Sequence, residues 1–295
     1  MKPVAAPEKF LGNRPGIVVA TAHSPMGGDG VGRVLCIANQ KGGVGKTTTA
    51  VNLAASLAGA QRRALLVDID PQASATSGLG LRDLQDRPTA YDIIMGERQA
   101  ADAISPTQLE RLDVLPAHRD LVGAEVELVS ALAREFRLRD ALKPIRDRYD
   151  FVLIDCPPSL GLLTVNGLTA ADGVLIPLQC EYYAMEGLSA LMDTVDLIRE
   201  RLNQALVVEG IVLTMFDTRN SLSHQVSDEV RKHFSERVYR TVIPRNVRVS
   251  EAPSHGLPVT VYDPTSRGAQ AYVDLAREMI EQDTARSGAG QYTAP

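Results

Sequence analysis

The sequence predicts an α/β protein with a doubly wound, mostly parallel sheet and helices on both faces. Of its 295 residues, 44% are hydrophobic, which is enough to build one large core. Short apolar runs rich in Val, Ile and Leu alternate with amphipathic segments of helix length, the order that βαβ units require. These runs show little polar alternation, as expected for parallel strands buried on both faces.

The expected elements follow one another from residue 34 to residue 281. Apolar runs predict strands at Val34–Asn39, Ala64–Ile69, Leu112–Pro116, Phe151–Asp155, Val174–Leu178, Gly210–Met215 and Val238–Ile243. Helical patterns predict helices at Lys46–Ala58, Gly123–Glu135, Leu138–Tyr149, Leu163–Ala170, Tyr183–Leu202, His224–Ser235 and Ser266–Glu281. No repeat or linker interrupts this order, so we expect one domain over residues 33–282. Ligands of such sheets bind at the carboxyl ends of the strands.

A glycine-rich loop lies between the first expected strand and the first expected helix. It reads Lys41-Gly42-Gly43-Val44-Gly45-Lys46-Thr47-Thr48. Glycines let backbone N–H groups wrap a polyphosphate, and the following helix N-terminus adds partial positive charge. Lys46 can reach the β- and γ-phosphates, and the Thr47 hydroxyl can ligate Mg²⁺. The loop therefore predicts a nucleoside triphosphate site.

The loop departs from the common phosphate-loop pattern at its start. The pattern G-x-x-x-x-G-K-[ST] places glycine where this chain has Gln40, and a second lysine, Lys41, follows it. An additional cation in the loop is electrostatically costly unless an anion lies near it. We therefore interpret Lys41 as a second phosphate contact, to the nucleotide of a facing subunit; the alternative is a solvated loop lysine.

Acidic residues end two further apolar runs. Asp68 and Asp70 share one strand face as the second run ends before Pro71. We expect Asp70 to position the attacking water, and the alternative is a turn or capping aspartate. Asp155 ends the fourth run, in the form of an acidic motif that holds Mg²⁺. With Thr47 and the phosphates, Asp155 would complete the metal site, since Mg²⁺ retains several waters; the alternative is an ordinary strand-end aspartate.

Composition limits the remaining possibilities. A net charge of −5 excludes a polybasic protein, although a local basic patch remains compatible with it. Cys36, Cys156 and Cys180 lack metal-binding spacing, which favours buried, reduced thiols and a cytoplasmic location. No apolar run reaches the roughly 20 residues that span a bilayer. Residues 1–32 and 283–295 are small and polar enough that we expect flexible ends.

Taken together, these motifs resemble those of the ParA-type partitioning ATPases. These belong to the deviant phosphate-loop (deviant Walker A) group of P-loop NTPases, which also includes MinD and the nitrogenase iron protein. The resemblance runs from about residue 33 to residue 281. Its segments are Asn39–Thr49, Val67–Thr76, Leu153–Leu163, Gln179–Leu188 and Val242–Pro258. The last segment, which begins Ile243-Pro244-Arg245-Asn246, is the most specific.

The resemblance implies roles for individual residues. Lys41 matches the lysine that crosses to the partner's nucleotide in an ATP-bound dimer, and Gly42 lies where the subunits meet, so a side chain there should block dimerisation. Asp70 matches the aspartate required for hydrolysis. ATP and Mg²⁺ are the implied cofactors. The implied ATP-binding residues are Lys41, Gly42, Gly43, Val44, Gly45, Lys46, Thr47, Thr48, Pro244 and Arg245; the catalytic ones are Lys41, Lys46 and Asp70, and the metal ligands are Thr47 and Asp155.

The resemblance also implies partners: nonspecific double-stranded DNA, a second copy of the chain, and a ParB-type centromere-binding protein that stimulates hydrolysis. Arg219 and Arg248 match DNA-binding arginines. Residues 199–248 carry nine Lys and Arg against six Asp and Glu, an asymmetry that solvated helix faces also produce. A nucleoid-associated protein without membrane attachment is the implied location.

Two other functions compete with partitioning. A membrane-associated regulator of division-site placement, similar to MinD, would carry a C-terminal amphipathic helix, and the last residues show no such stripe. A metallocluster-type reductase or assembly ATPase would need paired cysteines at the dimer axis, and Cys156 has no neighbour at suitable spacing.

Overall fold

A computed structural model of the protein describes residues 32–84 and 87–290. Its centre is an eight-stranded sheet of order β3-β4-β2-β5-β1-β6-β7-β8. The strands are β1 (Arg33–Ile37), β2 (Ala64–Asp68), β3 (Ser105–Pro106), β4 (Leu112–Leu115), β5 (Phe151–Asp155), β6 (Gly173–Gln179), β7 (Val207–Phe216) and β8 (Val238–Pro244). Only the pairing of β3 with β4 is antiparallel among these strands. The predicted doubly wound sheet is confirmed, and each predicted strand overlaps an observed one.

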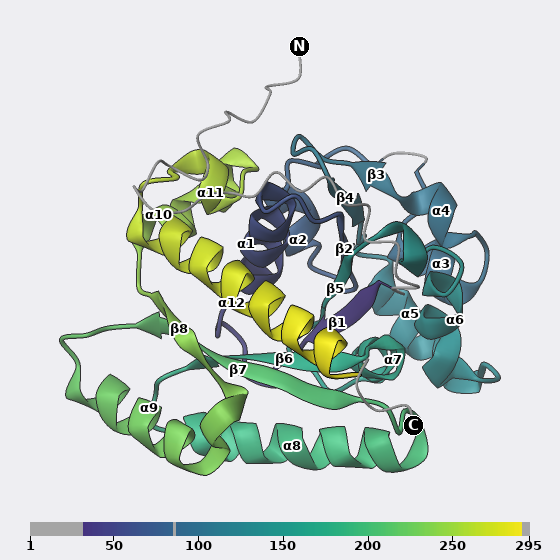
Figure 1. Ribbon diagram of the computed structural model, residues 1–295. Coiled ribbons are helices and arrows are strands. Elements are labelled where there is room, and N and C mark those ends of the chain that lie inside the picture. The colour runs from purple at the N-terminus through teal and green to yellow at the C-terminus, as the bar shows by residue number, and fades with distance from the viewer. Residues whose placement is uncertain (1–31, 85–86, 291–295) are drawn as a thin grey trace.

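Helices cover both faces of the sheet (Figure 1). One layer holds α1 (Lys46–Gly59), α2 (Ser74–Gly78), α10 (Val247–Glu251), α11 (Val259–Tyr262) and α12 (Arg267–Gly290). The other holds α3 (Ala90–Met95), α5 (Leu121–Glu127), α6 (Arg137–Leu142), α7 (Leu162–Ala170), α8 (Ala184–Arg201) and α9 (Ser221–Phe234), with the short α4 (Ala100–Ala103) at the edge. Alternate residues of β1 serve the two layers: Leu35 and Ile37 pack with α1 and α12, whereas Val34 and Cys36 pack with α7 and α8.

Two predicted helices are wrong. The segment 123–135 divides into α5, a 3₁₀ turn at Leu128–Ser130 and another at Arg134–Phe136. Ala133, between the turns, has a φ of 52°, in the left-handed region that an α-helix of L-residues avoids. The predicted helix 138–149 ends early at Leu142, because Pro144 cannot continue it.

The C-terminal helix is longer than predicted. The flexible end expected from residue 283 is corrected over its first part, because α12 continues to Gly290. Ion pairs hold this extension: Asp283 accepts from Arg33 at 2.8 Å, and Arg286 donates to Glu209 at 2.7 Å. Apart from Gly32, the expected N-terminal extension lies outside the described residues, as do residues 291–295.

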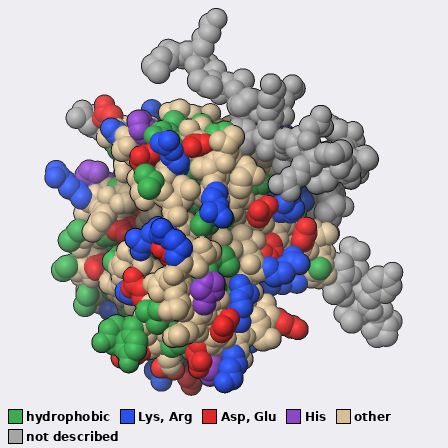
Figure 2. All heavy atoms as spheres, turned by 90° about the vertical axis from the view of Figure 1, so that its left-hand side faces the viewer, with side chains coloured by type: hydrophobic (Ala, Val, Ile, Leu, Met, Phe, Trp, Pro, Cys, Tyr) green, Lys and Arg blue, Asp and Glu red, His purple; other side chains and the backbone are tan. Residues whose placement is uncertain are grey.

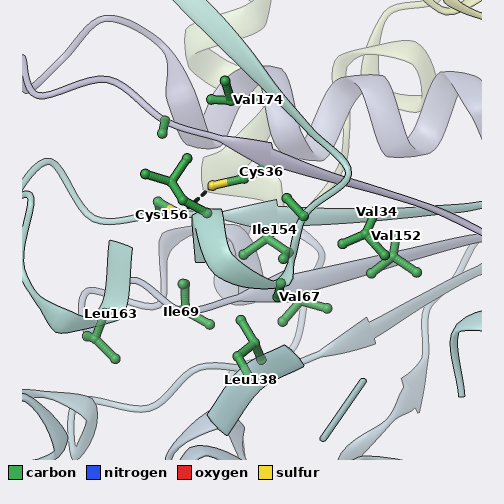
Figure 3. Packing of buried hydrophobic residues seen from close by; sticks show 14 of the residues in the cluster. Val34, Cys36, Val67, Ile69, Leu138, Val152, Ile154, Cys156, Leu163 and Val174 are labelled. Carbon is green, nitrogen blue, oxygen red and sulfur yellow. Dashed lines mark hydrogen bonds between the residues drawn. The ribbon is translucent and has the colours of Figure 1, made fainter. Parts of the chain in front are cut away.

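The three cysteines are free and buried, as predicted. Cys36 of β1 and Cys156, just after β5, bring their sulfur atoms within 3.2 Å (Figure 3). Gly167 of α7 packs directly against both: a Cβ there would lie 2.8 Å from the Cys156 sulfur and 3.2 Å from the Cys36 sulfur. The thiol pair therefore fixes how closely α7 approaches β1, which leads into the glycine-rich loop, and β5.

This close approach predicts that Gly167→Ala destabilises the protein. The added methyl group overpacks the core, which costs about 1–3 kcal/mol. Gly187→Ala is the matched control, because a Cβ at that position in α8 meets nothing within 4 Å, and replacing a helical glycine then adds about 0.5–1 kcal/mol of stability. Urea unfolding of both variants measures the two free energies. Equal stability of the two variants would contradict the packing described here.

Candidate nucleotide site

The glycine-rich loop connects the end of β1 to the start of α1. Gly43 and Gly45 have φ angles of 75° and 89°, in a region that glycine occupies without a steric penalty. Gly45 is also the N-cap of α1. This conformation places the loop around the N-terminal end of a 14-residue helix, where unpaired N–H groups and the helix dipole favour an anion.

Two side chains, Thr214 and Asn39, hold the loop in place. The Thr214 hydroxyl, on β7, donates to the Val44 carbonyl at 2.8 Å. Asn39, just after β1, accepts from the Lys41 N–H at 3.0 Å and donates to the Pro177 carbonyl on β6 at 2.7 Å. Sequence reasoning did not identify Thr214 as part of the site, because a threonine in an apolar strand carries no local signal of a distant contact.

Lys46 is buried at the start of α1. Its ammonium donates to the carbonyl of Lys41 at 3.1 Å, so it bridges the two ends of the loop. Burial lowers the pKa of Lys46, while the nearby carboxylates of Asp155 and Asp70 oppose that shift. A buried ammonium with a single carbonyl partner has spare donors, which phosphate oxygens would satisfy.

Asp68 and Asp155 lie side by side because β2 and β5 pair in register at these residues. Asp68 is well partnered: its Oδ2 accepts from the hydroxyl and the N–H of Thr76, at 2.7 and 2.9 Å. Burial still raises the pKa of Asp68 to about 6. Its role is structural support for the end of β2, and sequence reasoning gave it no such role.

Both carboxylate oxygens of Asp155 are buried without a hydrogen-bond partner. Burial, and then the charge of Asp68, raise the pKa of Asp155 well above the ordinary value, and the neighbouring Thr47 hydroxyl opposes that shift. Such an orphaned carboxylate requires an explanation. Asp155 and Thr47 fit a hard cation such as Mg²⁺, whose preferred ligands are oxygens. No cluster of three or more His, Cys, Asp or Glu side chains suited to a metal occurs within residues 32–84 and 87–290.

Asp70 lies near Lys46 and Asp155, in the turn that follows β2. It is 7% exposed, and its Oδ1 accepts from the N–H of Gln72 at 2.9 Å. Asp70 therefore makes the turn contact expected of an aspartate before Pro71, but this contact uses only Oδ1 of the carboxylate. The side chain also lines the cleft described next, so a solvent molecule in the cleft can reach it.

A cleft of about 510 Å³, a volume suited to a small-molecule ligand, is lined by both the glycine-rich loop and Asp70. It is lined by Gly42, Gly43, Gly45, Lys46, Thr47, Thr48 and Asp70 on one side and by Pro244, Arg245 and Asn246 on the other. Asp155 is fully buried and is not among the lining residues. The Arg245 N–H donates to the Phe216 carbonyl at 3.1 Å, which fixes the second wall to β7. A larger cavity, about 640 Å³, lies beside α3, α4 and α6 but contains none of the predicted residues.

Two residues of the predicted ATP set do not face this cleft. Val44 is 1% exposed and contributes its carbonyl to the contact with Thr214. The Lys41 side chain points out of the cleft and forms an ion pair with Glu181. In this position the Lys41 ammonium does not line the cleft of its own chain. A Cβ on Gly42 would meet nothing within 4 Å, so this part of the loop faces open space.

The two predicted DNA-binding arginines both follow the carboxyl ends of strands, as the glycine-rich loop does. Arg219 follows β7 and Arg248 belongs to α10, which follows β8; β7 and β8 are neighbours. Arg219 is paired with Asp217 at 3.0 Å and lowers the pKa of that carboxyl to about 2. Arg248 is paired with Glu251 at 2.8 Å and with Asp263 at 3.3 Å. Figure 2 views the side where α9 and α10 lie, and basic side chains are interspersed there with acidic ones.

The loop, the buried acids and the sheet topology define a P-loop nucleotide-binding protein. A family model described as "AAA domain" matches residues 32–208. The chain is 57% identical over 257 residues to the "Chromosome partitioning protein ParA" of Myxococcus xanthus, covering 87% of this chain and 91% of that protein. It is also 57% identical over 249 residues to the "Sporulation initiation inhibitor protein Soj" of Bacillus subtilis, covering 84% and 98%. The chain belongs to the ParA/Soj family of chromosome-partitioning ATPases.

Solved structures share this fold. The crystal structure of "Cobyrinic Acid a,c-diamide synthase" from Mycobacterium smegmatis, solved with an ATP analogue and magnesium, is 38% identical in sequence and has a TM-score of 0.73. The match covers 84% of this chain and 93% of that one. In residues 32–84 and 87–290, no helix is both long and apolar enough to cross a membrane.

The loop geometry predicts different outcomes at two adjacent glycines. In Gly43→Ala, the left-handed backbone costs about 1–2 kcal/mol, so the loop relaxes away from its binding conformation and ATP affinity falls about 5- to 30-fold. In Gly42→Ala, the added methyl group meets no protein atom within 4 Å and has no positive φ to strain, so the loop keeps its conformation and ATP affinity falls less than in Gly43→Ala. Calorimetric titration with ATP and Mg²⁺ compares the variants. A larger loss in Gly42→Ala would refute this assignment of the two glycines.

Proposed function

We propose that this protein is an ATP-driven switch for partitioning chromosomes or plasmids. ATP binding joins two copies across their nucleotides, the dimer binds DNA without sequence preference, and a ParB-type partner stimulates hydrolysis and release. The observation that carries the proposal is that two lysines of one loop occupy different environments. Lys46 is buried within the site and Lys41 points out of it. One nucleotide site requires Lys46. Lys41 would contact phosphate only if the nucleotide of another subunit faced it.

The site contains the parts that hydrolysis requires. Backbone N–H groups of the loop and Lys46 would hold the phosphates, and Thr47 and Asp155 would hold Mg²⁺, which would neutralise charge on the phosphates. Asp70, with one oxygen free of the Gln72 contact, orients the attacking water. Lys41 of the second subunit adds positive charge at the nucleotide, so the complete site forms only in the dimer. Slow turnover by the protein alone follows, since the partner must supply the final alignment.

DNA binding would arise at the edge of the sheet that carries the nucleotide site. Arg219 and Arg248 are both exposed and both paired with carboxylates, and exposed pairs of this kind are weak. DNA phosphates can therefore compete for both guanidinium groups. One copy offers few such cations; dimerisation doubles their number on one duplex, which raises affinity through multivalency. The protein would then be cytoplasmic and associated with the nucleoid.

Binding to a random DNA duplex tests this function. Measured without nucleotide, with ADP and with ATP, each with Mg²⁺, binding should appear only with ATP and weaken steeply between low and high salt, because phosphate contacts release counterions. Arg219→Ala combined with Arg248→Ala should abolish DNA binding while ATP-driven dimerisation persists. Arg277→Ala is the control, because Arg277 is similarly exposed and paired, with Asp274, but lies on α12. Binding that is independent of nucleotide would overturn the proposal, and binding to liposomes instead would favour a MinD-like regulator.

A second prediction concerns hydrolysis. Asp70→Ala should retain ATP binding and dimerisation but lose most ATP turnover, about 100-fold or more if the carboxylate orients water, and should remain on DNA. Phosphate release and sedimentation in ATP measure the two properties. Lys46→Ala is the comparison variant, which should lose nucleotide binding itself. Normal turnover by Asp70→Ala would show that Asp70 has only its turn role.

A further inference from the structure

Lys41 has a specific intramolecular partner. Its ammonium pairs with the carboxylate of Glu181, and the side chains are 40% and 45% exposed. The other oxygen of that carboxylate accepts from the side-chain amide of Gln179. Both oxygens of Glu181 are therefore engaged, and the acid is oriented toward the loop.

The two residues are brought together by neighbouring strands. Lys41 follows β1 and Glu181 follows β6, and these strands pair in parallel. The backbone on each side is fixed: the Lys41 N–H donates to Asn39, and the Glu181 N–H donates to the Gln179 carbonyl at 2.9 Å. The long, partly exposed lysine side chain can rotate about this fixed backbone, so Lys41 can change partner without any change in the sheet.

We propose that Glu181 is a positioning residue that holds Lys41 away from the nucleotide in the free subunit. This inference rests on the proposed function, in which Lys41 crosses to the partner's ATP. Dimerisation then exchanges one ion pair for another: Lys41 leaves Glu181 and contacts the partner's phosphates. Glu181 thereby opposes dimerisation of free subunits, and the more highly charged triphosphate overcomes it.

The exposure of the pair sets the size of the effect. Ion pairs this exposed to water are weak, so Glu181 can lower the population of free Lys41 by up to about 5-fold per subunit. Two such pairs open when two copies join. Removing both should tighten the ATP-dependent dimer by up to about 25-fold, a change large enough to measure but small enough for ATP to overcome.

The test is Glu181→Gln, which removes the charge and retains the shape and the acceptor for Gln179. Sedimentation with a nonhydrolysable ATP analogue and Mg²⁺ gives the dimer dissociation constant. We expect a lower dissociation constant for Glu181→Gln than for the unmodified protein. Glu186→Gln is the control: it removes the same charge from an exposed residue in the first turn of α8, five positions away, and should leave the constant unchanged. A purely structural role would leave dimerisation unchanged or weaken it, and either result overturns the proposal.

A double-mutant cycle separates this proposal from a general effect of charge. With Lys41→Gln already present, Glu181→Gln should have no further effect on dimerisation, because the residue that it restrains is gone. An equal gain in both backgrounds would overturn the inference. If the unmodified protein binds the analogue but forms no dimer at any concentration, the proposed function fails first; if it dimerises and Glu181→Gln does not dimerise more tightly, only the role of Glu181 fails.

Discussion

Charge buried with too few partners is the constraint on which this molecule depends. Lys46 has one carbonyl for its ammonium and Asp155 has no hydrogen-bond partner at all. Removing such groups from water is costly, and the attraction between Lys46 and the nearby carboxylates of Asp155 and Asp70 offsets only part of that cost. The parallel sheet brings these groups together, because β2, β5 and β1 are neighbours and their carboxyl ends lie side by side. The fold therefore maintains an incomplete electrostatic site, which a polyanion and a cation together would complete.

The second lysine extends the same principle beyond one subunit. Within the described chain, Lys41 satisfies its charge locally with Glu181, in a partly solvated position where the pairing is weak. Arg219 and Arg248 follow the same pattern with Asp217 and Glu251. Each cation proposed to act on another molecule is thus paired, within its own chain, with a carboxylate that is partly exposed to solvent. These cations can therefore exchange their carboxylate partner for a group on another molecule, whereas Lys46 is buried within its own chain.

Local spacing explains which parts could be predicted from the sequence. The loop at residues 41–48 and the strand that ends in Asp155 are contiguous patterns, and the structure places a loop before α1 and a strand at Phe151–Asp155 where these patterns predict them. Thr214 and Glu181 could not be found in this way, because they reach the loop through the pairing of β6 and β7, far along the chain. The helix predicted at 123–135 was wrong because the periodicity of apolar residues does not reveal the left-handed backbone at Ala133. The assigned roles in catalysis and DNA binding remain predictions.

The buried acid Glu209 links both ends of the described chain. Its side chain is fully shielded from solvent and accepts from Arg33, at the start of β1, and from Arg286, near the end of α12; the Tyr239 hydroxyl adds a third donor at 3.3 Å. A protein shortened before residue 286 would leave this carboxylate with one cation fewer. Fluorescent tags for imaging this protein in cells are therefore better joined beyond Pro295, with a spacer, than in place of the last helical turns.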